Sequence, residues 1–126
     1  MSKIAEGRSG RRARVRRDTV MTMDSDTSYT AAGELLKALA APLRIGIVTE
    51  LAAGPRCVHE LVDALGAPQP LISQHLRVLR GANVVHGARR GREIAYSLTD
   101  DHIARIVADA VSHATESTPN PARVGS

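Results

Sequence analysis

Apolar residues recur three and four positions apart through most of the chain between residues 29 and 80. This spacing places them on one face of an α-helix, so the segment is predicted to be helical. Proline and glycine interrupt the pattern and divide it into separate helices. The predicted helices cover about residues 29–41, 42–51, 58–65 and 69–80.

The pattern changes after residue 83. Residues 84–86 and 94–98 are rich in β-branched and aromatic types, which favour strands. Residues 87–92 between them are bounded by glycines and carry three arginines, as expected for the tip of a β-hairpin. Apolar residues then return at helical spacing and predict a last helix from about Asp100 to Thr115.

Two short helices joined by a tight glycine turn and followed by a β-hairpin have the order of a winged helix-turn-helix. The expected fold class is therefore mainly α with a small β-hairpin, which serves as the wing. The domain is expected to span residues 28–116 and to dimerise through its first and last helices.

Composition agrees with a small helical domain. The chain has 126 residues, and its only aromatic residues are Tyr29 and Tyr96, so Leu, Ile, Val and Ala must fill the core. A core of this size benefits from further burial in a dimer interface. No apolar run has membrane-spanning length, no secretion signal is recognisable, and the single Cys57 excludes an intrachain disulfide. We therefore expect a cytoplasmic protein without a membrane partner.

The positive charge is concentrated near the beginning of the chain. Residues 1–17 hold seven basic residues and one acidic residue, whereas the remainder holds ten basic and twelve acidic residues. Residues 1–27 lack hydrophobic periodicity and are predicted to be a disordered basic arm, which either contacts phosphates or is simply solvated. Alternatively, translation starts at Met21 or Met23. Residues 117–126 are predicted to be a flexible tail.

The fourth predicted helix carries side chains suited to reading DNA. Its apolar residues take the inward positions, so Ser73, Gln74 and Arg77 project toward solvent. Glutamine can bond adenine, arginine can bond guanine or phosphate, and serine can bond either a base or a phosphate. Residues 69–92 hold five arginines and no acidic residue. The candidate DNA-binding residues are Gln69, Ser73, Gln74, His75, Arg77, Arg80, Arg89, Arg90 and Arg92.

Three further features are less specific. His75 lies by its helical angle near the core side of the fourth helix, where a partly buried hydrogen-bonding role competes with a base contact. His86 precedes the wing tip and is assigned no function. Cys57, His59 and Glu60 cluster at the start of the third helix, where either a second metal site or a purely structural role fits.

The last predicted helix contains the pattern D-x-H, ten residues, then H-x-x-E, formed by Asp100, His102, His113 and Glu116. The two histidines face nearly the same way on a helix but lie roughly 16 Å apart along its axis. Because zinc holds a histidine nitrogen at about 2.0–2.1 Å, one chain cannot bring both to one ion. Two such helices packed antiparallel would pair Asp100 and His102 of one chain with His113 and Glu116 of the other. Asp100 also suits a helix N-cap, and the two roles are compatible.

The same helix offers an apolar surface through which two chains can pair. Six apolar residues recur at helical spacing beside the proposed ligands. The alternative interpretation is an ordinary helix with polar residues next to its buried face. The apolar residues are Ile103, Ile106, Val107, Ala110, Val111 and Ala114.

Over roughly residues 30–116 the chain resembles the ArsR/SmtB family of metal-responsive repressors. The segments that carry the resemblance are LAAPLRIGIV (39–48), HELVDAL (59–65), QPLISQHLRVLR (69–80) and GREIAYSL (91–98). The pattern in 69–79 is specific for the family, and D-x-H-x10-H-x-x-E is specific for its C-terminal-helix zinc-sensing subgroup. The resemblance implies a homodimer that represses a double-stranded DNA operator and releases it when metal binds at Asp100, His102, His113 and Glu116. The family's other site would use Cys57 and Glu60 with ligands from the N-terminal arm, which this sequence lacks.

Two imidazoles and two carboxylates suit Zn²⁺ in tetrahedral coordination, with Co²⁺ as a possible substitute. Four protein ligands leave no open position for a substrate, and no nucleophile triad or phosphate loop is recognisable elsewhere, so we do not expect an enzyme. Two alternatives stay open. One is a winged-helix regulator that answers another signal, such as redox chemistry at Cys57, and the other is a dimeric metal-binding module without specific DNA binding.

Overall fold

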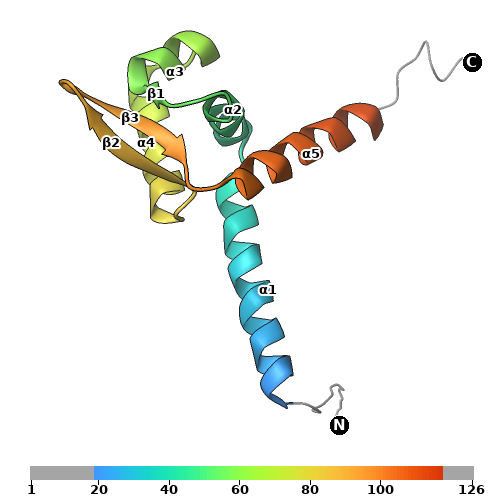
Figure 1. The fold of residues 1–126 in the computed structure, drawn as a ribbon. Coiled ribbons are helices and arrows are strands. Elements are labelled where there is room, and N and C mark those ends of the chain that lie inside the picture. The colour runs from blue at the N-terminus through green and yellow to red at the C-terminus, as the bar shows by residue number, and fades with distance from the viewer. Residues whose placement is uncertain (1–18, 118–126) are drawn as a thin grey trace, which may run out of the picture. The chain divides into compact units, whose positions relative to one another are not determined.

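A computed structural model describes residues 19–117 of the chain. The chain divides into two units, residues 1–37 and residues 38–126. The first unit contains most of helix α1 (Thr19–Leu39), and the second contains all the other helices and strands (Figure 1). Within the described residues, no helix is long and apolar enough to cross a membrane.

Helix α1 begins at Thr19, well before the predicted start near Tyr29. The prediction of disorder for residues 1–27 was therefore wrong for residues 19–27, while residues 1–18 lie outside the described part. Neither glycine nor proline occurs between Thr19 and Ala32, and extending an existing helix costs far less than starting one. The helix continues here without an apolar stripe, so hydrophobic periodicity could not detect it.

Helices α2 (Pro42–Leu51), α3 (Val58–Leu65) and α4 (Gln69–Gly81) confirm the predicted helix-turn-helix with nearly the predicted bounds. Pro42 occupies the first turn of α2, where no backbone N–H is needed. Gly66 ends α3 with φ +66°, a left-handed conformation that glycine adopts without steric cost. Apolar residues of the three helices pack into one core, and the most buried are Ile47, Val48, Leu51, Leu61, Ile72, Leu76 and Leu79.

Strands β1 (Arg56–Cys57), β2 (Val85–Arg90) and β3 (Glu93–Leu98) form an antiparallel sheet in the order β1-β3-β2. We use "wing" for the β2–β3 hairpin, whose register pairs Val85 with Leu98 at its base. The strands extend further toward the tip than predicted, because cross-strand pairing reaches Arg90 and Glu93 and leaves a two-residue turn. Strand β1 was not predicted, since two residues are too short for a periodic pattern and pair only because the fold brings them beside β3.

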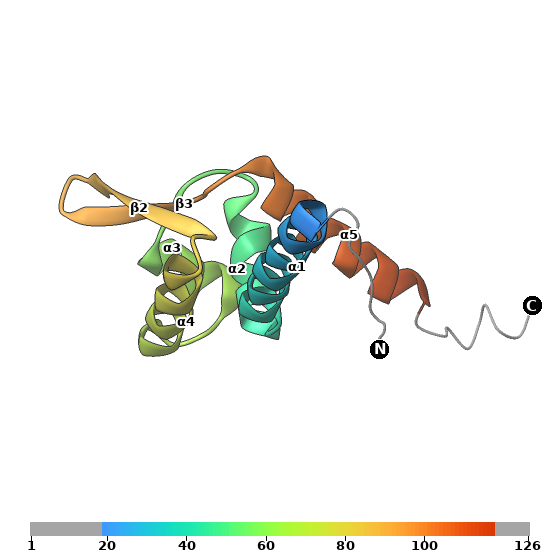
Figure 2. The same ribbon diagram turned by 90° about the horizontal axis from the view of Figure 1, so that it is seen from below.

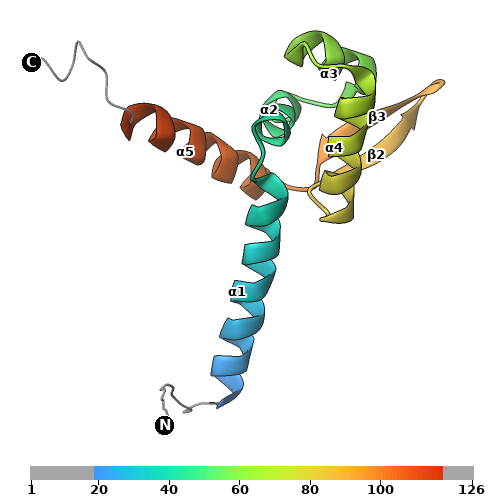
Figure 3. The same cartoon turned by 180° about the vertical axis from the view of Figure 1, so that it is seen from behind.

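Helix α5 (Asp101–Ser117) closes the domain and includes Ser117, which had been assigned to the tail. The segment before it is anchored, since Thr99 donates a backbone hydrogen bond to the carbonyl of Val84 (3.0 Å). The wing and α5 extend from the α2–α4 core in opposite directions in all three views (Figure 1, Figure 2, Figure 3). The rest of the predicted tail, residues 118–126, lies outside the described residues.

Candidate DNA-binding face and metal-ligating helix

Helix α4 has one apolar face and one polar face, as its sequence predicts. Ile72, Leu76 and Leu79 are at most 2% exposed, because they pack into the core. The polar residues lie away from that core: Gln69, Gln74, Arg77 and Arg80 are exposed, and Ser73 is partly buried. The predicted orientation of the helix is therefore confirmed, while base contacts remain a prediction.

Two open cavities flank the C-terminal half of α4. One of about 430 Å³ lies between α4 and β3 and includes Ser73, Arg77, Arg80 and Tyr96 in its lining. The other, of about 540 Å³, lies against the wing and includes Arg80, His86 and Arg89. No carboxylate lines either cavity, and Arg80 lines both. Arg77, Arg80 and Arg89 thus line two adjoining cavities, which together we call the basic groove.

The sequence did not single out His86 and Tyr96 as members of this groove. Each is isolated in a strand, and only the pairing of β2 with β3 beside α4 brings them to the surface that α4 shares with the wing. Gly87 is also part of this arrangement. A Cβ atom at Gly87 would lie 2.7 Å from Cγ2 of Ile94 and 3.3 Å from Cε1 of Tyr96, so these side chains occupy the space that a larger residue needs.

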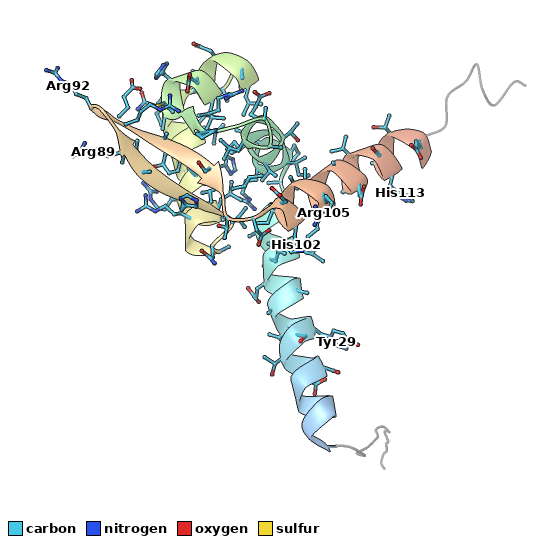
Figure 4. All side chains as sticks on the ribbon, in the orientation of Figure 1. Tyr29, Arg89, Arg92, His102, Arg105 and His113 are labelled. Atoms are coloured by element: carbon cyan, nitrogen blue, oxygen red, sulfur yellow. The ribbon has the colours of Figure 1, made fainter. Side chains whose placement is uncertain are left out.

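The three wing arginines differ in their surroundings. Arg89 and Arg92 lie toward the outer end of the hairpin (Figure 4). Arg90 instead faces α3, where its Nη1 lies 4.0 Å from Oε1 of Glu60. A carboxylate therefore partly offsets the charge of Arg90, and Arg89 and Arg92 are the better candidates for phosphate contacts.

His75 is partly buried and has a partner within the domain. Its Nδ1 lies 3.2 Å from Nη1 of Arg44 on α2. This placement agrees with the partly buried hydrogen-bonding role considered from the sequence. The sequence did not reveal Arg44, because the two residues lie far apart in the chain.

Cys57, His59 and Glu60 do not form a three-ligand metal site. No group of three or more His, Cys, Asp or Glu residues in the described range 19–117 could hold an ion. The backbone N–H of Cys57 donates to Oε1 of Glu60 (2.7 Å), and Nδ1 of His59 lies 3.2 Å from Oε2 of Glu93. These side chains are directed to partners in α3 and the wing, which agrees with the structural role considered from the sequence.

Two pKa values in this cluster are displaced by local interactions. A hydrogen bond to the Glu93 carboxylate, together with burial, raises the pKa of the Cys57 thiol. The hydrogen bond from the Cys57 backbone and the nearby Arg90 charge lower the pKa of Glu60. Cys57 is thus held as a neutral thiol and Glu60 as a carboxylate.

Asp100 and His102 lie together at the start of α5. Oδ1 of Asp100 is 3.6 Å from Nδ1 of His102 and also accepts a hydrogen bond from the backbone N–H of Ile103 (3.2 Å). Asp100 is therefore the N-cap of the helix, and the same carboxylate faces the histidine. Both side chains are at least half exposed, so another group can approach them from outside the chain.

His113 and Glu116 lie near the far end of α5, one helical turn apart and both exposed. Figure 4 shows His102 and His113 on the same flank of the helix, toward opposite ends. The two pairs of residues remain separated within one chain, as the helical rise predicts.

The apolar stripe of α5 is covered along only part of its length. Ile103 and Val107 are 5% and 3% exposed, since they pack into the core of their own chain. Further along, Val111 is 44% exposed, and Ala110 and Ala114 are also exposed. The second half of the stripe is therefore more exposed than the first, as Ala110 and Val111 show.

The helix-turn-helix and the start of the wing match a known family. Residues 41–86 match the model of the bacterial regulatory proteins of the arsR family. The chain is 43% identical over 91 residues to the HTH-type transcriptional regulator NmtR of Mycobacterium tuberculosis, covering 72% of this chain and 75% of that protein. The chain belongs to the ArsR family. The resemblance noted from sequence motifs is thereby confirmed.

Other relatives extend this comparison. The chain is 65% identical over 86 residues to the HTH-type transcriptional repressor SmtB of M. tuberculosis, covering 68% of this chain and 64% of that repressor. The match therefore spans somewhat less than two thirds of SmtB. Among solved structures, the transcriptional repressor BigR from Xylella fastidiosa aligns with a TM-score of 0.65 at 31% identity, over 79% of this chain and 98% of BigR. These proteins are regulators rather than enzymes, and the winged-helix fold predicted from the sequence is confirmed.

Proposed function

We propose that this chain is a dimeric, DNA-binding transcriptional repressor that releases its operator when zinc binds at α5. The observation that carries the proposal is the separation of the four candidate ligands into two exposed pairs, beside an apolar stripe that the chain leaves half uncovered. A second copy packed antiparallel along α5 would cover the stripe and complete both sites. Such a regulator works in the cytoplasm, where its DNA lies.

The basic groove supports the DNA-binding part of the proposal. Its arginines can follow the phosphate backbone, while Gln74 and Ser73 on the exposed face of α4 can contact base edges in the major groove. Gln69, at the N-terminal end of α4, would enter the major groove of the DNA. In the wing, Arg89 and Arg92 would hold the neighbouring backbone or minor groove.

The ligand chemistry supports zinc. One Asp–His pair and one His–Glu pair give two nitrogen and two oxygen donors, a set that suits tetrahedral Zn²⁺ and also accepts Co²⁺. The pair at Asp100 and His102 already brings a carboxylate oxygen and an imidazole nitrogen within 3.6 Å of each other, close enough for both to approach one ion. When bound, zinc would be held by Asp100 and His102 of one chain and His113 and Glu116 of the other, and it would supply a positive charge between their carboxylates.

The repressor names of the relatives support release, rather than recruitment, as the response to metal. Zinc would favour the dimer arrangement that best completes its sites, and it can shift DNA affinity only by its preference for that arrangement. We expect zinc to weaken operator binding by tenfold or more, within the roughly 5–150-fold range usual for allosteric coupling.

Mixed dimers test whether two chains share the ligands. A His102→Ala dimer and a His113→Ala dimer should each lose tight zinc binding, since each substitution damages both shared sites. A mixed dimer of the two variants should regain one intact site, formed by His102 of one chain and His113 of the other. Competition with a chelator measures the number of tight sites per dimer, and separate affinity tags isolate the mixed species.

His86→Ala is the matched control, because it removes a histidine from the basic groove and should leave both zinc sites intact. A mixed dimer that binds no more tight zinc than its parents would exclude ligands shared between subunits. Retention of zinc-induced operator release in the His102→Ala, His113→Ala double variant would exclude the four-residue assignment.

A redox regulator acting through Cys57 is the second candidate. Reactive cysteines are accessible and have depressed pKa values. Cys57 is 1% exposed and its pKa is raised, so thiolate formation at neutral pH is suppressed. We expect iodoacetamide to modify the folded protein much more slowly than the unfolded protein. Rapid modification of folded protein, accompanied by loss of operator binding, would favour the redox candidate instead.

A further inference from the structure

One arginine connects residues of three helices, α1, α2 and α4. Arg44, in the first turn of α2, is partly buried. Its Nε donates to the carbonyl of Ala38 (2.6 Å), in the last turn of α1, and its Nη1 lies 3.2 Å from Nδ1 of His75 on α4. The guanidinium therefore contacts two acceptors from different parts of the second unit.

The chemistry of the pair selects one histidine tautomer. Arginine has five N–H donors and no acceptor, so the contact is a hydrogen bond only when Nδ1 of His75 carries no proton and accepts. The ring proton then lies on Nε2. Ala38 is among the last residues of its helix, whose carbonyls have no intrahelical partner, so the guanidinium also satisfies an otherwise unpaired acceptor.

His75 is placed so that this bond can control the orientation of α4. It follows Gln74 directly and precedes Arg77 by two residues, and both of these lie on the exposed face. Leu76, its other neighbour, is 2% exposed and faces the core. A bond at His75 therefore acts at the border between the two faces, where it resists rotation of the helix about its axis.

We propose that Arg44 is a positioning residue for DNA recognition, and that His75 serves as its acceptor rather than as a base contact. By holding His75, Arg44 sets the rotation at which α4 presents Gln74 and Arg77 to the bases. This inference rests on the proposed DNA binding. It reassigns His75, which the sequence grouped with the DNA contacts, and gives a role to Arg44, which the sequence did not single out.

Substitutions at the two partners test the proposal. Arg44→Lys keeps the charge but replaces the planar guanidinium, whose Nε and Nη1 reach the two acceptors separately, with a single nitrogen, and His75→Leu removes the acceptor. Each should lower affinity for a duplex from upstream of the protein's own gene by about tenfold. Affinity for a scrambled duplex of equal length should change less than about twofold, because the phosphate-contacting arginines remain. His75→Asn should retain most specific binding, since its side-chain oxygen can replace Nδ1 as acceptor.

Arg56→Lys is the matched control. Arg56 also donates to a backbone carbonyl, that of Pro55 (3.0 Å), but its side chain has no bond to His75. It should leave both affinities unchanged. Thermal unfolding of every variant checks that a loss of specific binding does not come from loss of the fold.

Nitrogen NMR of His75 provides a readout independent of DNA. In the wild type, Nδ1 should be unprotonated and Nε2 protonated at neutral pH, and Arg44→Lys should weaken this preference. A parallel fall in specific and scrambled affinity, unchanged specificity, or a His75→Asn variant as weak as His75→Leu would each overturn the proposal. Failure of the wild type to prefer its own upstream duplex would instead overturn the proposed function, while the NMR signals would still report whether the Arg44–His75 bond exists.

Discussion

Helices α4 and α5 are both amphipathic, but the chain buries their apolar faces to different extents. Both are amphipathic, with 13 and 17 residues, and each sets candidate functional groups beside an apolar stripe. The stripe of α4 is buried along its whole length by its own chain, whereas that of α5 is buried only in its first half. A helix whose stripe is covered presents its polar face from a fixed position, whereas the half-exposed stripe of α5 leaves an apolar surface that a second copy of the chain can cover.

The two helices also differ in the chemistry of their polar faces. The α4 segment and the adjoining wing tip, residues 69–92, contain arginines and no carboxylate, which suits a polyanion. The polar face of α5 combines carboxylates with imidazoles, which suits a divalent cation. We therefore propose recognition of DNA for α4 and recognition of a metal ion for α5.

The largest expected effect is on stability and compares the buried first half of α5 with its exposed second half. Val107→Ala should lower the free energy of unfolding by about 2 kcal/mol, because it removes two buried methyl groups and leaves a cavity. Val111→Ala should change the stability of the single chain by less than about 0.5 kcal/mol but weaken the dimer roughly fivefold.

Chemical denaturation over a range of protein concentrations distinguishes the two valines, since a dimer's contribution to stability depends on concentration. If Val111→Ala were as destabilising as Val107→Ala at every concentration, the second half of α5 would have to pack within its own chain.

A smaller expected effect is on DNA affinity and compares an arginine of α4 with an arginine of α5. Arg80→Ala should weaken DNA binding by about tenfold. The slope of log affinity against log salt concentration should fall by about one, because one fewer counterion is released. Arg105→Ala, the same substitution at an exposed position on α5, should leave both quantities nearly unchanged. Fluorescence anisotropy titrations at several salt concentrations provide the measurement. Equal losses at the two positions would mean that α4 has no special role in contacting phosphate.

The smallest effect concerns the cap of α5. Asp100→Asn should leave stability within a few tenths of a kcal/mol, since asparagine caps helices as well as aspartate, whereas Asp100→Ala should cost about 1 kcal/mol. Both variants should bind zinc more weakly, because each lacks the carboxylate. Thermal unfolding of the metal-free protein and a zinc competition assay measure the two effects separately. Normal zinc affinity in Asp100→Asn would restrict Asp100 to its capping role.

Sequence patterns predicted the elements whose apolar residues repeat regularly. The inward positions of α4 and the bounds of α2 and α3 follow directly from the 3.6-residue period and from the proline and glycine that end each segment. The start of α1 and the short β1 strand have no such period. The orientation of the candidate ligands along α5 was also predictable, because a single regular helix fixes the positions of its side chains.

Contacts between distant residues depend on the fold. Arg44 and His75 come from segments far apart in the chain, and so do His59 and its partner Glu93 in the wing. His86 joins the basic groove only because β2 lies beside α4. A local sequence pattern shows none of these contacts. By itself, the sequence determined the helix-turn-helix, the basic face of α4 and the division of the α5 ligands, since these depend on spacing within one element. Only the tertiary structure decided which half of α5 is buried and which polar groups are already paired, because burial and pairing depend on the neighbours that folding supplies.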